Sequence, residues 1–217
     1  MRPYVFRYWK PRGVLSTTSL TNGQKTISCS SEIMNITKGL KVEPIGRLDK
    51  DSEGLLLLTT DCSISDILLR PSYHITGSHI EKEYHVTTEK FLSDEHIRTL
   101  SEGIEIKIRN WNKPKDIIKT LPCLIERIGL KNKLKIILRE GKNRQIRKMI
   151  GSCGHKVTNL RRVRFGSVDL VDMKVGEVKL LTEDQLLRLL ELRSNKDEST
   201  PTTFTSAAAA TNMSRDQ

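Results

Sequence analysis

The chain has 217 residues, of which 36% are hydrophobic, enough for one sizeable domain or one domain of two lobes. No uninterrupted apolar run exceeds four residues, whereas a membrane-spanning helix needs about 20, and no signal-peptide pattern follows Met1. The net charge of +11 favours a polyanionic partner, so these features predict a soluble, cytoplasmic protein that binds nucleic acid.

Basic residues are concentrated in two segments that contain no aspartate or glutamate. The first precedes Glu32, and the second, Gly141–Gly166, holds eight lysines and arginines. A nucleic acid explains this clustering better than a solvated charged surface or an anionic membrane does. The four cysteines lie far apart, which predicts reduced and mostly buried thiols. The histidines show no metal-ligand spacing, so we expect no metal site.

Strand patterns dominate the N-terminal third of the chain. Aromatic and β-branched residues predict a strand over Tyr4–Trp9, and a turn follows at Lys10–Gly13. The leucine run predicts a second strand over Leu55–Thr60, buried on both faces. A short helix over Ile64–Leu69 is expected to stop at Pro71.

Alternation continues through the middle of the chain. It predicts a strand over Glu83–Thr88, with Tyr84 and Val86 on one face. Ser93 is expected to cap a helix that ends near Gly103. Further strands are predicted at Ile104–Ile108, at Cys123–Arg127 and Leu134–Leu138 as a hairpin, at Val157–Phe165 and at Gly176–Leu181.

Two more helices are predicted in the C-terminal half. Asn143 is expected to cap the first, which turns its apolar residues inward. Thr182 and Gln185 form a capping box for the second, which is rich in leucine. From Ser194 onward the polar composition predicts a disordered tail. Many strands with a few interspersed helices, and no βαβ rhythm, predict an α+β fold.

A charged pair stands just before the leucine run. In an extended chain Arg47 and Asp49 share one face, and the intervening leucine faces the other way. A calcium loop beginning at Asp49 fails, because Thr60 occupies the position that needs a bidentate glutamate. A glycosidase pair of Asp49 and Asp51, or a turn that is merely rich in acids, remains compatible with the residues.

The segment Glu140–Met149 forms a second cluster. Gly141 permits a tight entry to a helix, whose first turn offers free N–H groups suited to phosphate. Arg144 and Arg147, three residues apart, face the same side of that helix. A basic surface helix explains the cluster equally well. Neither a Walker loop nor a GxGxxG motif is present, so nucleotide-cofactor chemistry has no support.

Several motifs, in this order and spacing, resemble those of the RsuA-type ribosomal RNA pseudouridine synthases. The resemblance extends over residues 4–193 and is specific because the motifs occur together. Cys62 and Asn22–Ser28 depart from the usual pattern without touching the proposed chemistry. The matching segments are Lys10–Ser16, Gly46–Asp49, Asp51–Thr59, Lys82–Val86, Glu140–Arg147, Leu160–Gly166 and Gly176–Glu177.

The resemblance implies a pseudouridine synthase fold, with a mainly antiparallel central sheet flanked by helices and two lobes around an RNA-binding cleft. It also implies an isomerisation that moves a uracil's attachment from nitrogen-1 to carbon-5 and needs neither cofactor nor metal. Asp49 is implied as the nucleophile and Arg147 as the group that orients it. Tyr84 would stack on the flipped base and take the carbon-5 proton, and Arg47 would hold the RNA.

The resemblance further implies a large-subunit ribosomal RNA substrate and a catalytic domain over residues 1–193. Family members often carry a preceding RNA-binding domain, and this chain, which is expected to begin directly with the catalytic one, looks most like the RluE branch. A monomer is expected because no heptad seam is visible. A small-subunit or transfer RNA substrate, or an inactive RNA-binding assembly factor, remains an alternative. The expected backbone contacts are Lys10, Arg12, Lys142, Arg144, Lys148, Arg161, Arg162 and Arg164.

Overall fold

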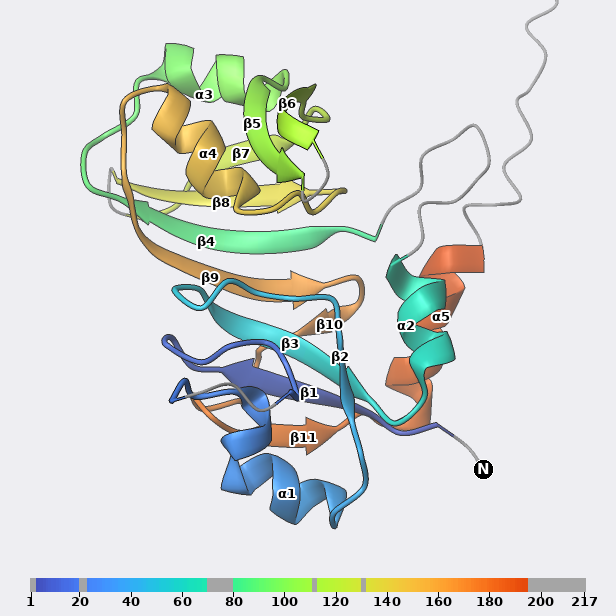
Figure 1. Cartoon of the computed structure of the whole chain (residues 1–217). Helices are drawn as coiled ribbons and strands as arrows, with labels where there is room; N and C mark the ends of the chain where they lie inside the picture. Colours follow the sequence, from blue (N-terminus) through green and yellow to red (C-terminus); the bar gives the residue numbers. More distant parts are fainter. Residues whose placement is uncertain (1–2, 20–22, 70–79, 111–112, 130–131, 195–217) are drawn as a thin grey trace, which may run out of the picture.

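A computed structural model of the chain describes residues 3–19, 23–69, 80–110, 113–129 and 132–194. Within these residues, nine strands form one sheet in the order β11-β1-β3-β9-β4-β8-β7, with β2 added beside β3 and β10 beside β9 (Figure 1). The strands are β1 (Val5–Lys10), β2 (Glu43–Ile45), β3 (Glu53–Thr59), β4 (Lys82–Thr88), β7 (Leu124–Arg127), β8 (Lys133–Leu138), β9 (Val157–Phe165), β10 (Val168–Asp169) and β11 (Val178–Leu180).

Helices and a small second sheet flank this central sheet, as the α+β prediction requires. The two-stranded sheet consists of β5 (Glu105–Asn110) and β6 (Lys113–Lys119). The helices are α1 (Ser31–Thr37), α2 (Cys62–Leu69), α3 (Asp94–Ser101), α4 (Gln145–Ser152) and α5 (Glu183–Ser194), with a 3₁₀ turn, η1, at Ile27–Cys29. Figure 1 shows α3 and α4 beside β5–β8 at one end, α1 at the other, and α2 next to α5.

The two halves of the sheet meet at β3 and β9. This is the one parallel contact among the described strand pairs of the sheet, and it joins Glu53–Gly54 to Arg161–Arg162. All the other pairs are antiparallel, which confirms the prediction of a mainly antiparallel sheet. The meeting point brings the end of the acidic segment close to the basic strand β9.

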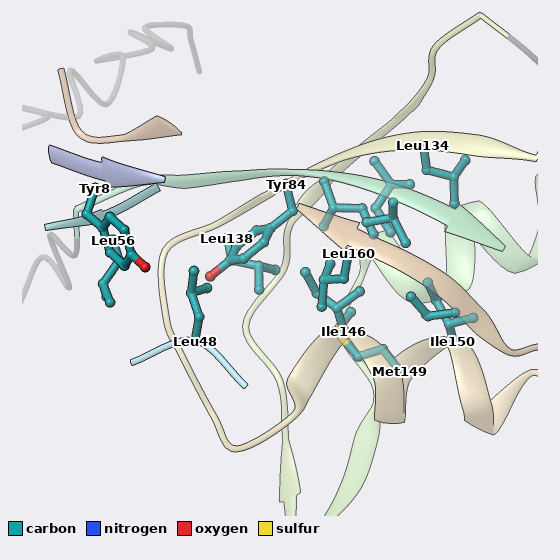
Figure 2. Packing of buried hydrophobic residues seen from close by; sticks show 14 of the residues in the cluster. Tyr8, Leu48, Leu56, Tyr84, Leu134, Leu138, Ile146, Met149, Ile150 and Leu160 are labelled. Atoms are coloured by element: carbon teal, nitrogen blue, oxygen red, sulfur yellow. The ribbon is translucent and has the colours of Figure 1, made fainter. Parts of the chain in front are cut away.

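The core consists of two apolar clusters, one on each side of the sheet. Leu56 of β3 packs in the first cluster and Leu57 in the second, which confirms that this strand is buried on both faces. Helix α4 adds Ile146, Met149 and Ile150 to the first cluster, against leucines of β8 and β9 (Figure 2). Burial on both sides therefore fixes the strands that carry the charged motifs.

Most predicted elements are confirmed, including the Ser93 cap, in which the serine side chain accepts from the His96 N–H, and the capping box of Thr182 and Gln185. The Asn143 cap is wrong, because Arg144 occupies that position and Asn143 Oδ1 instead accepts from Lys148 Nζ at 3.3 Å. Helix α1 and strands β2, β6 and β10 were not predicted.

The expectation of mostly buried thiols is also wrong, since Cys29 and Cys62 are exposed and the other two cysteines are half-buried. Pro71 and the predicted tail beyond Ser194 lie outside the described residues. Among the helices that the structure describes, none combines the length and the apolar character needed to cross a bilayer.

Candidate active site

A cavity of about 770 Å³ opens where three parts of the chain converge. Residues 46–50, which follow β2, form one wall, and the segment before α4 forms another. The inward face of β4 and β9 supplies a third, and Leu15, Ser16, Thr17 and Leu69 complete the lining. Arg47, Asp49, Tyr84 and Arg144, from both predicted clusters, all line this cavity. The structure therefore brings the acidic and basic motifs to one site.

Buried contacts of Leu48 hold the wall that carries Asp49. The backbone N–H of Leu48 donates to Ser16 Oγ at 3.1 Å, and the Ser16 hydroxyl donates back to the Leu48 carbonyl at 2.8 Å. The Leu48 side chain is buried beside Tyr84 (Figure 2). Arg47 and Asp49 both line the cavity, as predicted, and the buried Leu48 between them contributes to the lining as well.

Two arginines face the Asp49 carboxylate. Arg144 Nη1 lies 3.7 Å from Asp49 Oδ2, and Arg147 Nε lies 3.9 Å from the same oxygen. Arg144 Nη1 also lies 3.7 Å from Asp51 Oδ2. The Asp49 side chain is 24% exposed, so the ion pairs are only partly screened by solvent. The family resemblance implied Arg147 as the partner of Asp49, and the structure places Arg144 beside the same carboxylate.

The Arg147 guanidinium is fixed by its other nitrogens. Nη1 donates to the Val157 carbonyl at 3.2 Å, and Nη2 donates to the Asp51 carbonyl at 3.0 Å. Burial, together with the charge of nearby Arg144, lowers the pKa of Arg147 from its ordinary value, and the acids of the site oppose this shift. The backbone contacts leave Nε, which forms no hydrogen bond among the described residues, directed at Asp49.

A buried hydrogen-bond network shapes the loop before α4. Glu140 Oε1 accepts from the Leu121 N–H at 2.8 Å and from Gln145 Nε2 at 2.7 Å. Gln145 Oε1 in turn accepts from the Lys142 N–H at 2.9 Å. Arg144 takes a left-handed conformation, with φ of 51°, which is unfavourable for a side-chain-bearing residue. The network holds this strained residue beside Asp49.

The predicted RNA contacts differ in exposure. Arg47, Lys142 and Arg144 are exposed at the cavity. Arg12 is also exposed, but it donates to the Thr158 carbonyl and does not line the cavity. Lys148 is half-buried.

Two of the predicted RNA contacts must be corrected. Lys10 is 0% exposed, and its Nζ donates to the carbonyls of Pro11 and Val14. Arg162 is 2% exposed, and its Nε donates to the Leu55 carbonyl at 2.7 Å. Neither cation can reach an RNA backbone from these positions. Lys10 supports the turn after β1, and Arg162 lies in the cavity.

Arg161 and Arg164 are engaged elsewhere. Arg161 Nε lies 2.7 Å from Glu53 Oε1, and its guanidinium stacks on Trp9. Arg164 forms ion pairs with Glu83 and Glu81. Neither arginine lines the cavity. Their contact with RNA stays a prediction, and it would require these ion pairs to be exchanged.

Comparison with known proteins decides the family. Residues 4–152 match the family model described as RNA pseudouridylate synthase. The chain belongs to this family. It is 31% identical over 195 residues to the ribosomal large subunit pseudouridine synthase B of Bacillus subtilis, covering 88% of this chain and 72% of that protein. It is 36% identical to the dual-specificity RNA pseudouridine synthase RluF of Escherichia coli K12, covering 86% of this chain and 57% of that protein.

Solved structures of pseudouridine synthases share the fold. A crystal structure of a pseudouridylate synthase matches with a TM-score of 0.71 and 26% identity, covering 87% of this chain and 74% of the other. A Cbf5-Nop10-Gar1 complex matches with a TM-score of 0.54 at 18% identity, which shows the fold alone. The predicted pseudouridine synthase fold and the resemblance to RsuA-type enzymes are confirmed. The RluE-like branch stays a prediction, because the reported relatives are of the B and F types.

Proposed function

We propose that this chain isomerises a uridine of large-subunit ribosomal RNA to pseudouridine, with residues 1–193 as the catalytic domain. The observation that best supports this proposal is a carboxylate, Asp49, which lies between two guanidinium groups in a cavity large enough for a nucleotide. The relative from Bacillus subtilis is named for the large ribosomal subunit, which supports this substrate class. Such a substrate would place the activity in the cytoplasm, and we expect a monomer.

In this proposal Asp49 is the nucleophile, and its covalent bond to the nucleotide divides a difficult bond exchange into two easier steps. Arg147 aims the carboxylate, and Arg144 offsets part of its charge. Tyr84, 9% exposed on β4, stacks on the target uracil and accepts the carbon-5 proton. None of these steps requires a cofactor or a metal ion.

The exposed cations at the cavity would hold the RNA backbone. The target nucleotide must leave its stack, at a cost of a few kcal/mol, and phosphate contacts from Arg47, Lys142 and Arg144 offset this cost. Arg47 lies on the same wall as Asp49, where it can hold the RNA at the place that the target base has left.

The proposal is tested by offering three RNA pools to the purified chain: transcripts of large-subunit RNA, small-subunit RNA and transfer RNA. Pseudouridine is mapped by carbodiimide adducts and primer extension, since the product has the same mass as uridine. We expect one modified site in the large-subunit transcript, and none when Asp49→Asn replaces the wild type. Asp184→Asn, on exposed α5, is the matched control and should retain activity.

Binding without modification of any pool would indicate an RNA-binding assembly factor instead. Modification confined to the other pools would retain the chemistry and correct the substrate. Full activity of Asp49→Asn would rule out the mechanism.

A further inference from the structure

Four side chains form the floor of the cavity. Lys82 and Tyr84 lie two residues apart on β4 and therefore on one face. Across to β9, Lys82 pairs with Phe165 and Tyr84 pairs with Arg162. The register shift between these pairs leaves Val163 as an extra residue, and this bulge keeps Arg162 and Phe165 both on the cavity face. Two of the four floor residues are cations.

Both cations stand close to the same aromatic ring. Lys82 Nζ lies 5.4 Å from the centre of the Phe165 ring, and Arg162 Cζ lies 5.4 Å from that centre as well. Within the described part of the chain, neither forms an ion pair with an acid, and Arg162 Nη2 has no hydrogen-bond partner although it is buried. Lys82 Nζ donates to the Ile80 carbonyl at 3.2 Å.

Removal from water makes the charged form of these two groups less favourable. Desolvation, and then repulsion from Arg162, lower the pKa of Lys82 to about 8, while Glu140 partly offsets the shift. Glu140 itself is engaged by the Leu121 N–H and by Gln145. Arg162 is buried and Lys82 is half-buried, and a cation withdrawn from water without an acidic partner costs stability. Two cations kept in this state beside an open cavity indicate a ligand that presents acceptor oxygens to them.

The base of the bound nucleotide is the part that reaches this floor. Arg47, Lys142 and Arg144 are exposed cations at the same cavity, and they are positioned for the phosphates, which remain joined to the rest of the RNA. Arg162 is 2% exposed, so a group must enter fully to contact it. Tyr84, on the same floor, provides an aromatic face on which a flipped pyrimidine stacks.

We propose that Lys82 and Arg162 form an electrophilic subsite that binds the carbonyl oxygens of the target uracil and stabilises the negative charge that develops on them. This assignment rests on the proposed function, because it requires a uridine in the cavity. The subsite has donors only and no acceptor, which matches the two carbonyl oxygens of uracil.

Charge reaches those oxygens whichever atom Asp49 attacks. Attack on C1′ breaks the C1′–N1 bond, and the electron pair left on N1 is delocalised onto O2 and O4. Attack on C6 moves the C5–C6 π electrons through C4 onto O4. On either route the C1′–N1 bond is broken, a C1′–C5 bond forms and the covalent bond to Asp49 breaks. C5 loses its proton and N1 gains one, so the isomerisation balances and Asp49 is regenerated. A preorganised cation in a partly dry cavity stabilises such charge more than water does.

The test compares floor variants with matched controls on the transcript that the wild type modifies. The rate is measured in single turnover as tritium release from carbon-5, and RNA affinity is measured by filter binding. Lys82→Met retains the apolar stem and removes a half-buried charge, so it is expected to fold. We expect it to lose about 100-fold in rate, as loss of an oxyanion donor does, with affinity changed less than about threefold. Arg162→Lys should retain more activity than Arg162→Gln.

Controls and a second substrate separate this role from a structural one. Lys133→Met and Arg188→Gln change exposed residues outside the cavity and should match the wild type. In a transcript made with 5-fluorouridine, the fluorine itself withdraws charge from the ring. The variants should then lose less, relative to the wild type, than on the uridine transcript, measured as the disappearance of 5-fluorouridine from a nuclease digest.

Each outcome decides the assignment. Wild-type rate in Lys82→Met, or equal losses on both transcripts, would overturn it, whatever the folding of the Arg162 variants. A large loss of affinity with an unchanged single-turnover rate would reduce the floor to a binding role and would also overturn it. If the wild type itself forms no pseudouridine, the proposed function fails first and this assignment fails with it.

Discussion

The Nε atom of Arg147 lies 3.9 Å from Oδ2 of Asp49, although the two residues belong to different motifs of the chain. The distance is slightly longer than that of a hydrogen bond, and the other guanidinium nitrogens are held by the carbonyls of Val157 and Asp51. Arg147 is thus anchored to the backbone on both sides of the site, and Asp49 meets a cation that cannot move away.

Arg147→Lys should therefore be far less active than the wild type, although the substitution retains the positive charge. A lysine ammonium cannot contact two carbonyls and Asp49 through a planar fork, so the carboxylate loses its orienting partner. We expect the single-turnover rate of pseudouridine formation to fall by about 100-fold. RNA affinity should change little, because the side chain is only 12% exposed. A variant that retains the full rate would show that charge alone suffices.

Salt dependence of RNA binding should separate the exposed from the buried cations. Affinity falls as salt rises, and each phosphate contact that is lost reduces the magnitude of the negative slope of log affinity against log salt by about 0.7 to 0.9. We expect this decrease for Arg47→Gln and for Lys142→Gln, which are exposed at the cavity. Arg188→Gln on α5 is the control and should leave the slope unchanged. Equal slopes for all three variants would place the RNA elsewhere on the surface.

Much of the fold could be predicted because alternation is a local signal. In β4 the even-numbered residues Tyr84, Val86 and Thr88 are buried, as the pattern requires. Helix α1 was missed because it is short and buries only Ile33 and Thr37, which is too few for a helical stripe. Strand β2 has three residues, one of them Pro44, and its pairing with β3 has no counterpart in the local sequence.

The depth of individual cations was harder to predict. Lys10 follows Phe6 and Tyr8 at a spacing of two, so alternation places it inward if the strand continues to residue 10. The sequence instead predicts a turn beginning at Lys10, and a residue in a turn is expected to be exposed. Arg162 stands among basic neighbours, and a bulge changes the phase of the strand just after it. A bulge depends on the partner strand, so the sequence of β9 alone could not reveal which arginine faces the cavity.

Two lysines, the buried Lys10 and the half-buried Lys82, should give stability an unusual pH dependence. The pKa of Lys82 and that of Lys10 are both lowered to about 8, mainly by burial, from an ordinary value of 10.5. Above pH 8 the unfolded chain therefore binds more protons at these sites than the folded chain does. The free energy of unfolding should then rise with pH, by at most about 1.4 kcal/mol per pH unit for each lysine.

Urea unfolding of the wild type and of Lys82→Met between pH 7.5 and 9 measures this effect. The variant lacks one of the two groups, so its free energy of unfolding should rise less steeply. The range ends at pH 9 because of Cys123. Burial raises the pKa of this thiol to about 11, so above pH 9 it ionises in the unfolded chain before it does in the folded one, and this opposes the lysine effect. Lys133→Met, an exposed control, should show the wild-type slope, and parallel curves for all three proteins would contradict the prediction.

Gly54→Ala should separate the two halves of the sheet. Gly54 is the residue at which β3 pairs with β9, and its φ of +110° is one that other residues rarely adopt. An added Cβ would lie 2.2 Å from the carbonyl oxygen of Arg162, which is backbone and cannot move independently. We expect a loss of more than about 3 kcal/mol in the free energy of unfolding. Gly151→Ala in α4 meets no atom within 4 Å and should be neutral or stabilising by up to about 1 kcal/mol. Because the clash falls on Arg162, any Gly54→Ala protein that folds should bind RNA yet modify it slowly. If the variant instead has the stability and the rate of the wild type, β3 and β9 are not held together at this point.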